Sequence, residues 1–208
     1  MGGIDYARMA RLCARADELG TAPDAKPSVK LVYEERTKSA LAEFVAAHDA
    51  LAVAETAWRK ESREAHEALA TLDQPYAEAR AVLFAYLPDA SLPETLKAQP
   101  TDTDRKRSIE RLLDAVDDHA GQSWADGLLS GPFGTRAAAV IQEVNESIAA
   151  NAALAAARDA RANKFGVAYE RYLAFKNVVR NAYGPSSPQY RRIHLRANAS
   201  SGEDEPTS

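Results

Sequence analysis

Apolar side chains recur at helical spacing along most of the chain, and this pattern predicts an all-α protein. The clearest run starts at Leu41, and the larger residues then return every three or four positions as far as Tyr86. Their mean step is about 3.5 residues, the repeat of helices that pack as a coiled coil. We therefore expect a long helix with one seam against a neighbouring helix. The seam positions are Leu41, Phe44 or Val45, His48, Leu51, Glu55, Trp58, Ser62, Ala65, Leu69, Leu72, Tyr76, Ala79, Leu83 and Tyr86.

Pro75 falls inside this seam, where a proline removes a helical hydrogen bond and costs about 3 kcal/mol. The pattern keeps its phase across the proline, with Leu72 before it and Leu83 after it. This favours one helix over about 28–87, kinked near Pro75. The alternative is a break at which Asp73 caps a second helix.

Cap and turn residues mark the other helix ends. Ser28 is the expected N-cap of the long helix. Gly20, Gly121 and Gly184 are expected to end three further helices, because glycine adopts the left-handed conformation found after many helices. Three prolines mark residues 88–104 as a loop. The further helices are predicted over about 4–19, 105–119 and 136–183.

The expected architecture is an elongated antiparallel helical bundle with two long helices, about 28–87 and 136–183. The residues around 48–54 resemble those around 151–157, so the bundle is a candidate for a duplicated helical unit. The predicted boundaries are 1–27 for an N-terminal helix and linker, 28–196 for the bundle, and 197–208 for a disordered acidic tail.

The amino-acid composition supports a helical fold and predicts a core with few large apolar side chains. Alanine supplies 43 of the 208 residues, as expected of a chain built from helices. Leu, Ile, Val and Phe together supply only 39 residues, which is little apolar bulk for a self-sufficient core. We therefore expect Ala-lined helices that approach closely, and a protein that self-associates through the surface around 149–160.

Residue patterns that carry common chemistries are missing from the sequence. The one cysteine, Cys13, permits no internal disulfide and favours a reducing, cytoplasmic location. The Glu-x-x-His pairs of di-metal bundles do not occur, nor does a P-loop or a Gly-x-Ser-x-Gly elbow. We therefore expect no enzyme, no cofactor and no bound metal. Because no apolar run approaches 18 residues, membrane insertion is not expected either.

Three polar residues interrupt the apolar seam at intervals of seven. His48, Glu55 and Ser62 thus form a polar column along one face of the predicted helix. Polar residues at such positions usually fix the register or the choice of partner, and this is the interpretation we favour. The alternative treats Glu55 as a catalytic base.

Charge is distributed unevenly along the sequence. Residues 164–196 carry seven basic side chains, one acidic side chain and six of the 15 aromatic residues, whereas residues 1–163 are acidic overall. Basic and aromatic side chains together are typical of contacts with nucleic acid or another polyanion. We favour pairing with acidic residues of the same chain or of a neighbouring subunit. The candidate contact residues are Lys176, Arg180, Arg191, Arg192 and Arg196.

A second basic cluster opens the predicted helix at 105–119. Arg105, Lys106 and Arg107 fall in its first turn, where the helix dipole disfavours an exposed cation by about 0.3 to 1 kcal/mol. We expect compensating acidic partners from the same chain, from a second subunit or from a polyanion.

The segment FKNVVRNAYGPSSPQYRRI, Phe175–Ile193, joins a basic amphipathic helix end to an aromatic-glycine pair and a Ser/Pro-rich turn. It resembles a sequence pattern found near helix ends in uncharacterised, Ala-rich, all-helical bacterial proteins. The resemblance implies a helical bundle of bacterial type, and it carries no activity and no functional residue with it.

Together these patterns predict a non-enzymatic structural or interaction protein. The expected partner is a second copy of the chain or another protein. The alternative function is nucleic-acid or polyanion binding through 164–196, which we rank second because the net charge of the chain is -4.

Overall fold

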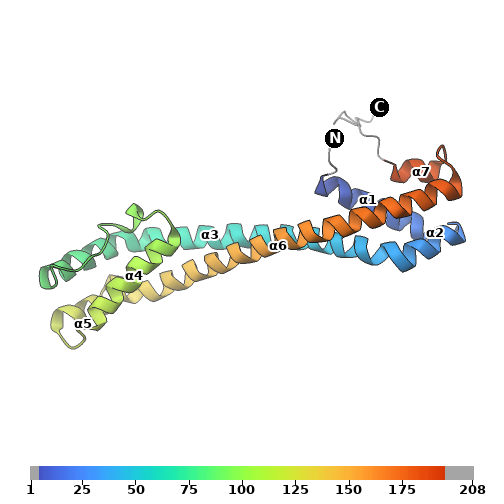
Figure 1. The fold of residues 1–208 in the computed structure, drawn as a ribbon. Coiled ribbons are helices and arrows are strands. Elements are labelled where there is room, and N and C mark those ends of the chain that lie inside the picture. Colours follow the sequence, from blue (N-terminus) through green and yellow to red (C-terminus); the bar gives the residue numbers. More distant parts are fainter. Residues whose placement is uncertain (1–4, 195–208) are drawn as a thin grey trace, which may run out of the picture. The chain divides into compact units, whose positions relative to one another are not determined.

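The structure is a computed structural model that describes residues 5–194, and every regular element in this part of the chain is helical (Figure 1). The predicted all-α class is therefore confirmed. The two long helices are also present, as α3, Lys38–Tyr86, and α6, Pro132–Tyr183. The other helices are α1, Tyr6–Thr21, α2, Pro27–Val32, α4, Asp102–Asp117, α5, Ser123–Ser130, and α7, Pro188–Ile193.

Helix α3 runs through Pro75 without a break. The prediction of one helix across the proline is confirmed, and the alternative of a second helix capped by Asp73 is wrong. Leu72, Tyr76 and Leu83 are each fully buried, so the same apolar stripe continues on both sides of the proline. Packing of this stripe holds the backbone helical where the proline removes a hydrogen bond.

The N-terminal end of the long helix differs from the expectation. Pro27 occupies the first helical turn of α2, so the prediction of Ser28 as the N-cap is wrong. A π-helical turn, Tyr33–Thr37, then joins α2 to α3. The Thr37 hydroxyl donates a hydrogen bond to the carbonyl of Val32 at 3.2 Å, five residues earlier. The apolar period does not reveal such a turn, because the turn is only five residues long.

The sequence predicts Gly20 as the residue that ends α1, but α1 continues to Thr21 and Gly20 is buried within it. The ring of Tyr33 occupies the space that a Cβ atom on Gly20 would need. The Tyr33 hydroxyl donates a hydrogen bond to the carboxylate of Asp17. Gly20 therefore serves close packing between elements. Gly184, by contrast, follows α6 with a φ of 90°, and it ends that helix as predicted.

Helix α4 begins three residues earlier than predicted. Thr101 is its N-cap, and the Thr101 hydroxyl accepts a hydrogen bond from the amide of Asp104 at 3.1 Å. The first turn therefore carries Asp102 and Asp104 rather than Arg105 to Arg107. The predicted conflict between this basic cluster and the helix dipole is wrong, because the favourable acidic residues come first.

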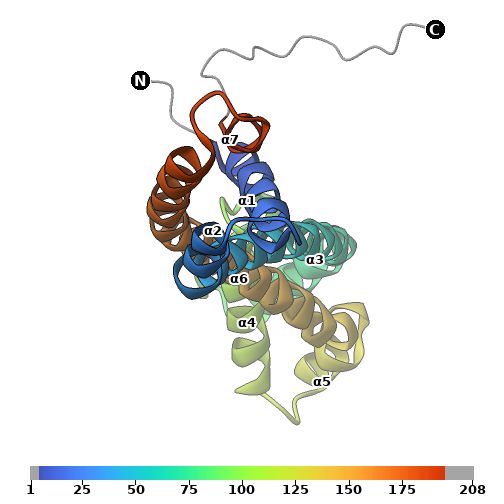
Figure 2. The ribbon, with the colours of Figure 1, turned by 90° about the vertical axis from the view of Figure 1, so that its right-hand side faces the viewer.

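The described residues form two compact units, and both long helices contribute to each unit. Unit 1 combines the described parts of 1–52 and 156–208. In this unit α7 lies beside α1 (Figure 2). The core of unit 1 consists of Met9, Leu12, Cys13, Ala16, Leu19, Val29, Tyr33, Leu41, Phe44, Ala168, Tyr172, Phe175, Val179 and Ile193.

Unit 2 comprises residues 53–155. Its parts of α3 and α6 run side by side in opposite directions, and α4 and α5 join the same core (Figure 1). The loop between α3 and α4 contains a short 3-10 turn, Leu96–Ala98. The core residues of unit 2 are Ala65, Leu69, Leu72, Tyr76, Ala79, Leu83, Leu96, Ile109, Leu112, Val116, Ala125, Phe133, Ala137, Val140 and Val144.

Candidate functional site

The basic segment ends in a corner of unit 1 where α7 folds back against α1. Ser187 is the N-cap of α7 and accepts a hydrogen bond from the amide of Tyr190 at 3.2 Å. Ile193, the last residue of α7, is fully buried in the core. Its carbonyl accepts a hydrogen bond from the buried Tyr172 hydroxyl of α6. These contacts fix the position of α7 and of the two arginines in its last turn.

Two arginines of this corner have side chains with neither a hydrogen bond nor an ion pair to any residue that the structure describes. They are Arg180, in the last turn of α6, and Arg191, in the last turn of α7. Both line the same pocket, which contains no acidic side chain of residues 5–194. The remaining lining residues are Pro185, Ser186, Tyr190 and His194.

Two other cations of the segment have acidic partners in unit 1. The Lys164 ammonium lies 2.6 Å from the carboxylate of Glu43 on α3, and this hydrogen bond holds the pKa of Glu43 below its ordinary value. Arg192 pairs with Glu18 of α1 at 3.2 Å. The structure therefore places the same-chain acidic partners that we expected beside these two residues.

Lys176 lies on the α6 side of the corner, with its ammonium 6.0 Å from the centre of the Tyr190 ring. Burial, and then the nearby charge of Arg180, lower the pKa of Lys176 from its ordinary value. The remaining predicted contact residue, Arg196, lies outside the described residues.

The basic cluster at the start of α4 is compensated within its own helix. Each cation has a carboxylate three or four residues away, so these residues do not form an uncompensated basic surface. The pairs are Arg105 with Asp102 at 2.9 Å, Lys106 with Glu110 at 3.4 Å, and Arg107 with Asp104 at 3.4 Å.

The three residues of the polar column lie half-buried along α3. The ring of His48 stacks on Phe44 with 6.0 Å between ring centres, and its buried Nδ1 has no hydrogen-bond partner within the described chain. Ser62 lines a shallow pocket together with Trp58. Because seven residues of helix span about 10 Å, His48, Glu55 and Ser62 are too far apart to act as one site.

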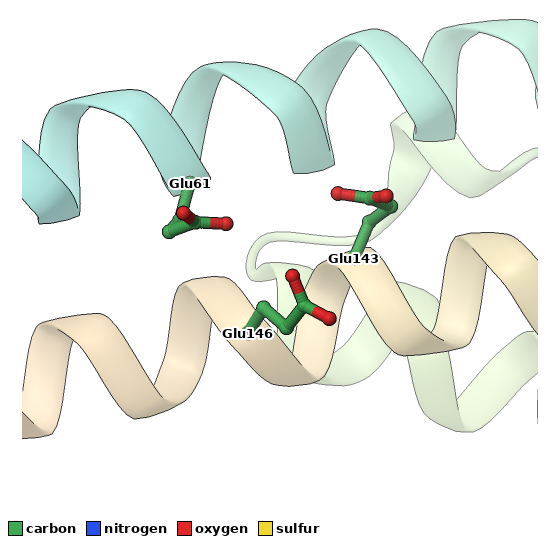
Figure 3. Close-up of side chains that lie close together, drawn as sticks. All are labelled: Glu61, Glu143 and Glu146. Carbon is green, nitrogen blue, oxygen red and sulfur yellow. The ribbon is translucent and has the colours of Figure 1, made fainter.

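A cluster that the sequence analysis missed lies between α3 and α6 in unit 2. Glu61 of α3 and Glu143 and Glu146 of α6 each bring a carboxylate oxygen within 4.8 Å of the others. The side chains point toward one another across the gap between the two helices (Figure 3). Oxygen Oε2 of Glu61 is buried and has no hydrogen-bond partner in the part of the chain that the structure describes.

Carboxylate oxygens suit hard cations such as Mg²⁺ and Ca²⁺, so this cluster is where a metal could bind in unit 2. Two of the three groups also have neighbours in the protein. Oε1 of Glu61 lies 2.9 Å from the ammonium of Lys60, and Glu146 accepts a hydrogen bond from the amide of Gln142 at 2.9 Å. We therefore treat the cluster as crowded acidic groups, and the absence of a bound metal stays a prediction.

The sequence indicated only two of the three members of this cluster. Glu143 and Glu146 are three residues apart, which places both carboxylates on one helix face. A search for Glu-x-x-His pairs passes over them because neither partner is histidine. Glu61 could not be predicted, because its approach depends on the register between α3 and α6.

Comparisons with protein-family models, with curated proteins and with solved structures found no match to this chain. Within residues 5–194, no helix combines the length and the apolar character needed to cross a membrane.

Proposed function

We propose that this chain is a non-enzymatic structural or interaction protein that self-associates through α6. One observation carries the proposal. Over residues 149–162 of α6, Leu154 is the one buried side chain. Elsewhere α6 buries a residue at almost every turn, so here most of the helix surface is free to meet a partner. The exposed alanines of this alanine segment, defined as 149–160, are Ala149, Ala152, Ala153, Ala155, Ala156 and Ala160.

Larger apolar side chains are also exposed in unit 2. One directly precedes the alanine segment in the sequence of α6, and another lies on α3. Val53 of α3 is 70% exposed, and Ile148 of α6 is 40% exposed. Small side chains let two helices approach closely, and larger apolar side chains gain from burial at about 25 cal/mol per Å². A second copy of the chain would supply a surface of the same chemistry, as in a two-fold symmetric interface.

A different role for the alanines is simple helix formation, because alanine is the best helix former and needs no partner. The two roles differ in their response to a charge. A glutamate in a solvated helix is tolerated, since glutamate also has good helix propensity. In a helix interface the same glutamate would be buried without a partner and would oppose assembly.

The test is the mass of two variants by light scattering after size exclusion. Ala153→Glu should shift the protein toward the monomer while circular dichroism shows unchanged helix content. Ala138→Glu is the matched control, because Ala138 is equally an exposed alanine of α6 and lies outside the alanine segment. Equal masses for Ala153→Glu and the unmodified protein would contradict the proposed interface.

The second candidate function, polyanion binding through 164–196, is favoured by one observation. Arg180 and Arg191 line a pocket without acidic neighbours in its walls. The pairing of Lys164 with Glu43 and of Arg192 with Glu18 argues against a basic surface along the whole segment. Among the cations of the segment without an acidic partner, Arg180 and Arg191 lie together at one pocket, and this limits the kind of ligand that they suit.

A further inference from the structure

The pocket at the corner of α6 and α7, which we name the corner pocket, is built from two helix ends and the turn that joins them. Arg180 comes from α6, Pro185 and Ser186 from the turn, and Arg191 from α7, together with Tyr190 and His194. All these residues belong to unit 1. Because α7 is anchored through Ile193 and its helix cap, the pocket has fixed walls on two sides.

Positive charge continues around α7. Arg191 also lines a neighbouring pocket, together with Arg15, Glu18 and Arg192. Glu18 is the one carboxylate among the residues that line these two pockets, and it is paired with Arg192 at 3.2 Å. Arg180 and Arg191 are thus left without a counter-charge in residues 5–194. Such a concentration of like charge raises the local potential and attracts anions.

Helix ends explain part of this arrangement. Arg180 and Arg191 lie in the last turns of their helices, where a cation interacts favourably with the helix dipole by about 0.3 to 1 kcal/mol. The dipole explains why each arginine is tolerated on its own helix. It does not explain why unpaired, exposed arginines from two helix ends line one pocket, with the half-buried Lys176 near the Tyr190 ring of the same pocket.

We propose that the corner pocket binds the phosphate group of a small phosphorylated ligand, with Arg180 and Arg191 as the charged contacts. A guanidinium group offers two parallel N–H donors, which match two oxygens of a phosphate. The Ser186 and Tyr190 hydroxyl groups are neutral donors in the same walls, which the His194 ring also lines. The proposal does not depend on self-association, because every contact comes from one chain.

The pocket favours a compact phosphate over a nucleic-acid strand. A strand needs cations spaced along a groove, and usually aromatic faces on which successive bases stack. Lys164, at the start of the basic segment, is engaged by Glu43, and Arg192 is engaged by Glu18. Two unpaired arginines at one point fit a single phosphate group, or two linked ones, better than an extended chain.

The test is isothermal titration of the full chain with inorganic pyrophosphate at constant ionic strength. The double variant Arg180→Gln/Arg191→Gln should bind roughly a hundredfold more weakly, since each of the two charge-assisted contacts contributes roughly a factor of ten. Arg36→Gln is the matched control, because Arg36 is an exposed arginine of unit 1 whose side chain has no pair in the described chain, and it lies outside both the corner pocket and the alanine segment. It should bind pyrophosphate like the unmodified protein.

Three outcomes would overturn the proposal. The first is no measurable binding of pyrophosphate by the unmodified chain, and the second is equal binding by the double variant. The third uses a single-stranded 20-nucleotide DNA probe. The unmodified chain would bind this DNA with a steep salt dependence, would lose that binding in the double variant, and would not bind pyrophosphate. That combination would show a nucleic-acid surface instead. None of these results changes the mass of the assembly, so failure here is distinct from failure of self-association.

Discussion

Because Gly20 has no side chain, α1 packs closely against the π-helical turn that contains Tyr33. The buried ring of Tyr33 fills the space beside Gly20. The Tyr33 hydroxyl donates a hydrogen bond to Asp17, which lies on α1 with Gly20. Glycine normally weakens a helix interior by up to about 1 kcal/mol relative to alanine. At this position the close contact outweighs that cost, because any larger residue would displace a fully packed aromatic ring.

We expect Gly20→Ala to lower the free energy of unfolding by about 1 to 3 kcal/mol, the usual cost of overpacking a core. Gly166→Ala is the matched control, because Gly166 also lies inside a helix of unit 1 but has open space around its Cα. That change should raise stability by about 0.5 to 1 kcal/mol. Urea unfolding followed by circular dichroism measures both, and a stabilising Gly20→Ala would show that the Tyr33 ring is not held against α1.

The carboxylates of Glu61, Glu143 and Glu146 repel one another within 4.8 Å. Glu143→Gln should therefore raise the free energy of unfolding by about 0.5 to 1 kcal/mol, and more at low salt than at high salt. Glu170→Gln is the control, because Glu170 is exposed and has no ion pair within residues 5–194. It should have little effect.

A second readout of the same variants distinguishes repulsion from metal binding. Thermal unfolding of the unmodified protein should be insensitive to millimolar Mg²⁺, Ca²⁺ or Mn²⁺. A clear stabilisation by one of these ions that Glu143→Gln removes would show that the cluster is a cation site, and that the prediction of no bound metal is wrong.

Among the helices, the two long ones were the most predictable part of the fold. Leu72, Tyr76 and Leu83 keep one phase across Pro75, so the sequence alone predicts a continuous helix there. The sequence also held a signal for the N-cap of α4 that our prediction of 105–119 missed, because Thr101 and Asp104 form a capping pattern of the threonine-x-x-acid kind. The π-helical turn at Tyr33–Thr37 could not be predicted, because it depends on where Tyr33 packs.

Pro75 tests the continuity of α3 directly. Pro75→Ala restores a backbone N–H in the helix interior, so we expect stability to stay equal or to rise by up to about 3 kcal/mol. Pro75 is only half-buried, and little packing is lost with its ring. A marked loss of stability in urea unfolding would show that the proline, rather than the apolar stripe, determines the local backbone.

At the scale of the whole molecule, composition predicted an all-α chain, but the two compact units could not be predicted. Their boundaries cut both long helices, at Ala52 and Val53 of α3 and at Ala155 and Ala156 of α6. A sequence pattern records which face of a helix is apolar, but not how far along the helix each partner extends. The same limit applies to the corner pocket, which forms only when α7 folds back and brings Arg191 and Arg180 together.

The absolute mass of the unmodified chain in solution decides whether the protein self-associates. Light scattering reports mass without an assumption about shape, so it gives the number of copies from the chain mass of 22.5 kDa. At tens of micromolar we expect a whole-number multiple of that mass, falling toward one copy on dilution. A strictly monomeric protein across the whole concentration range would show that the chain does not self-associate.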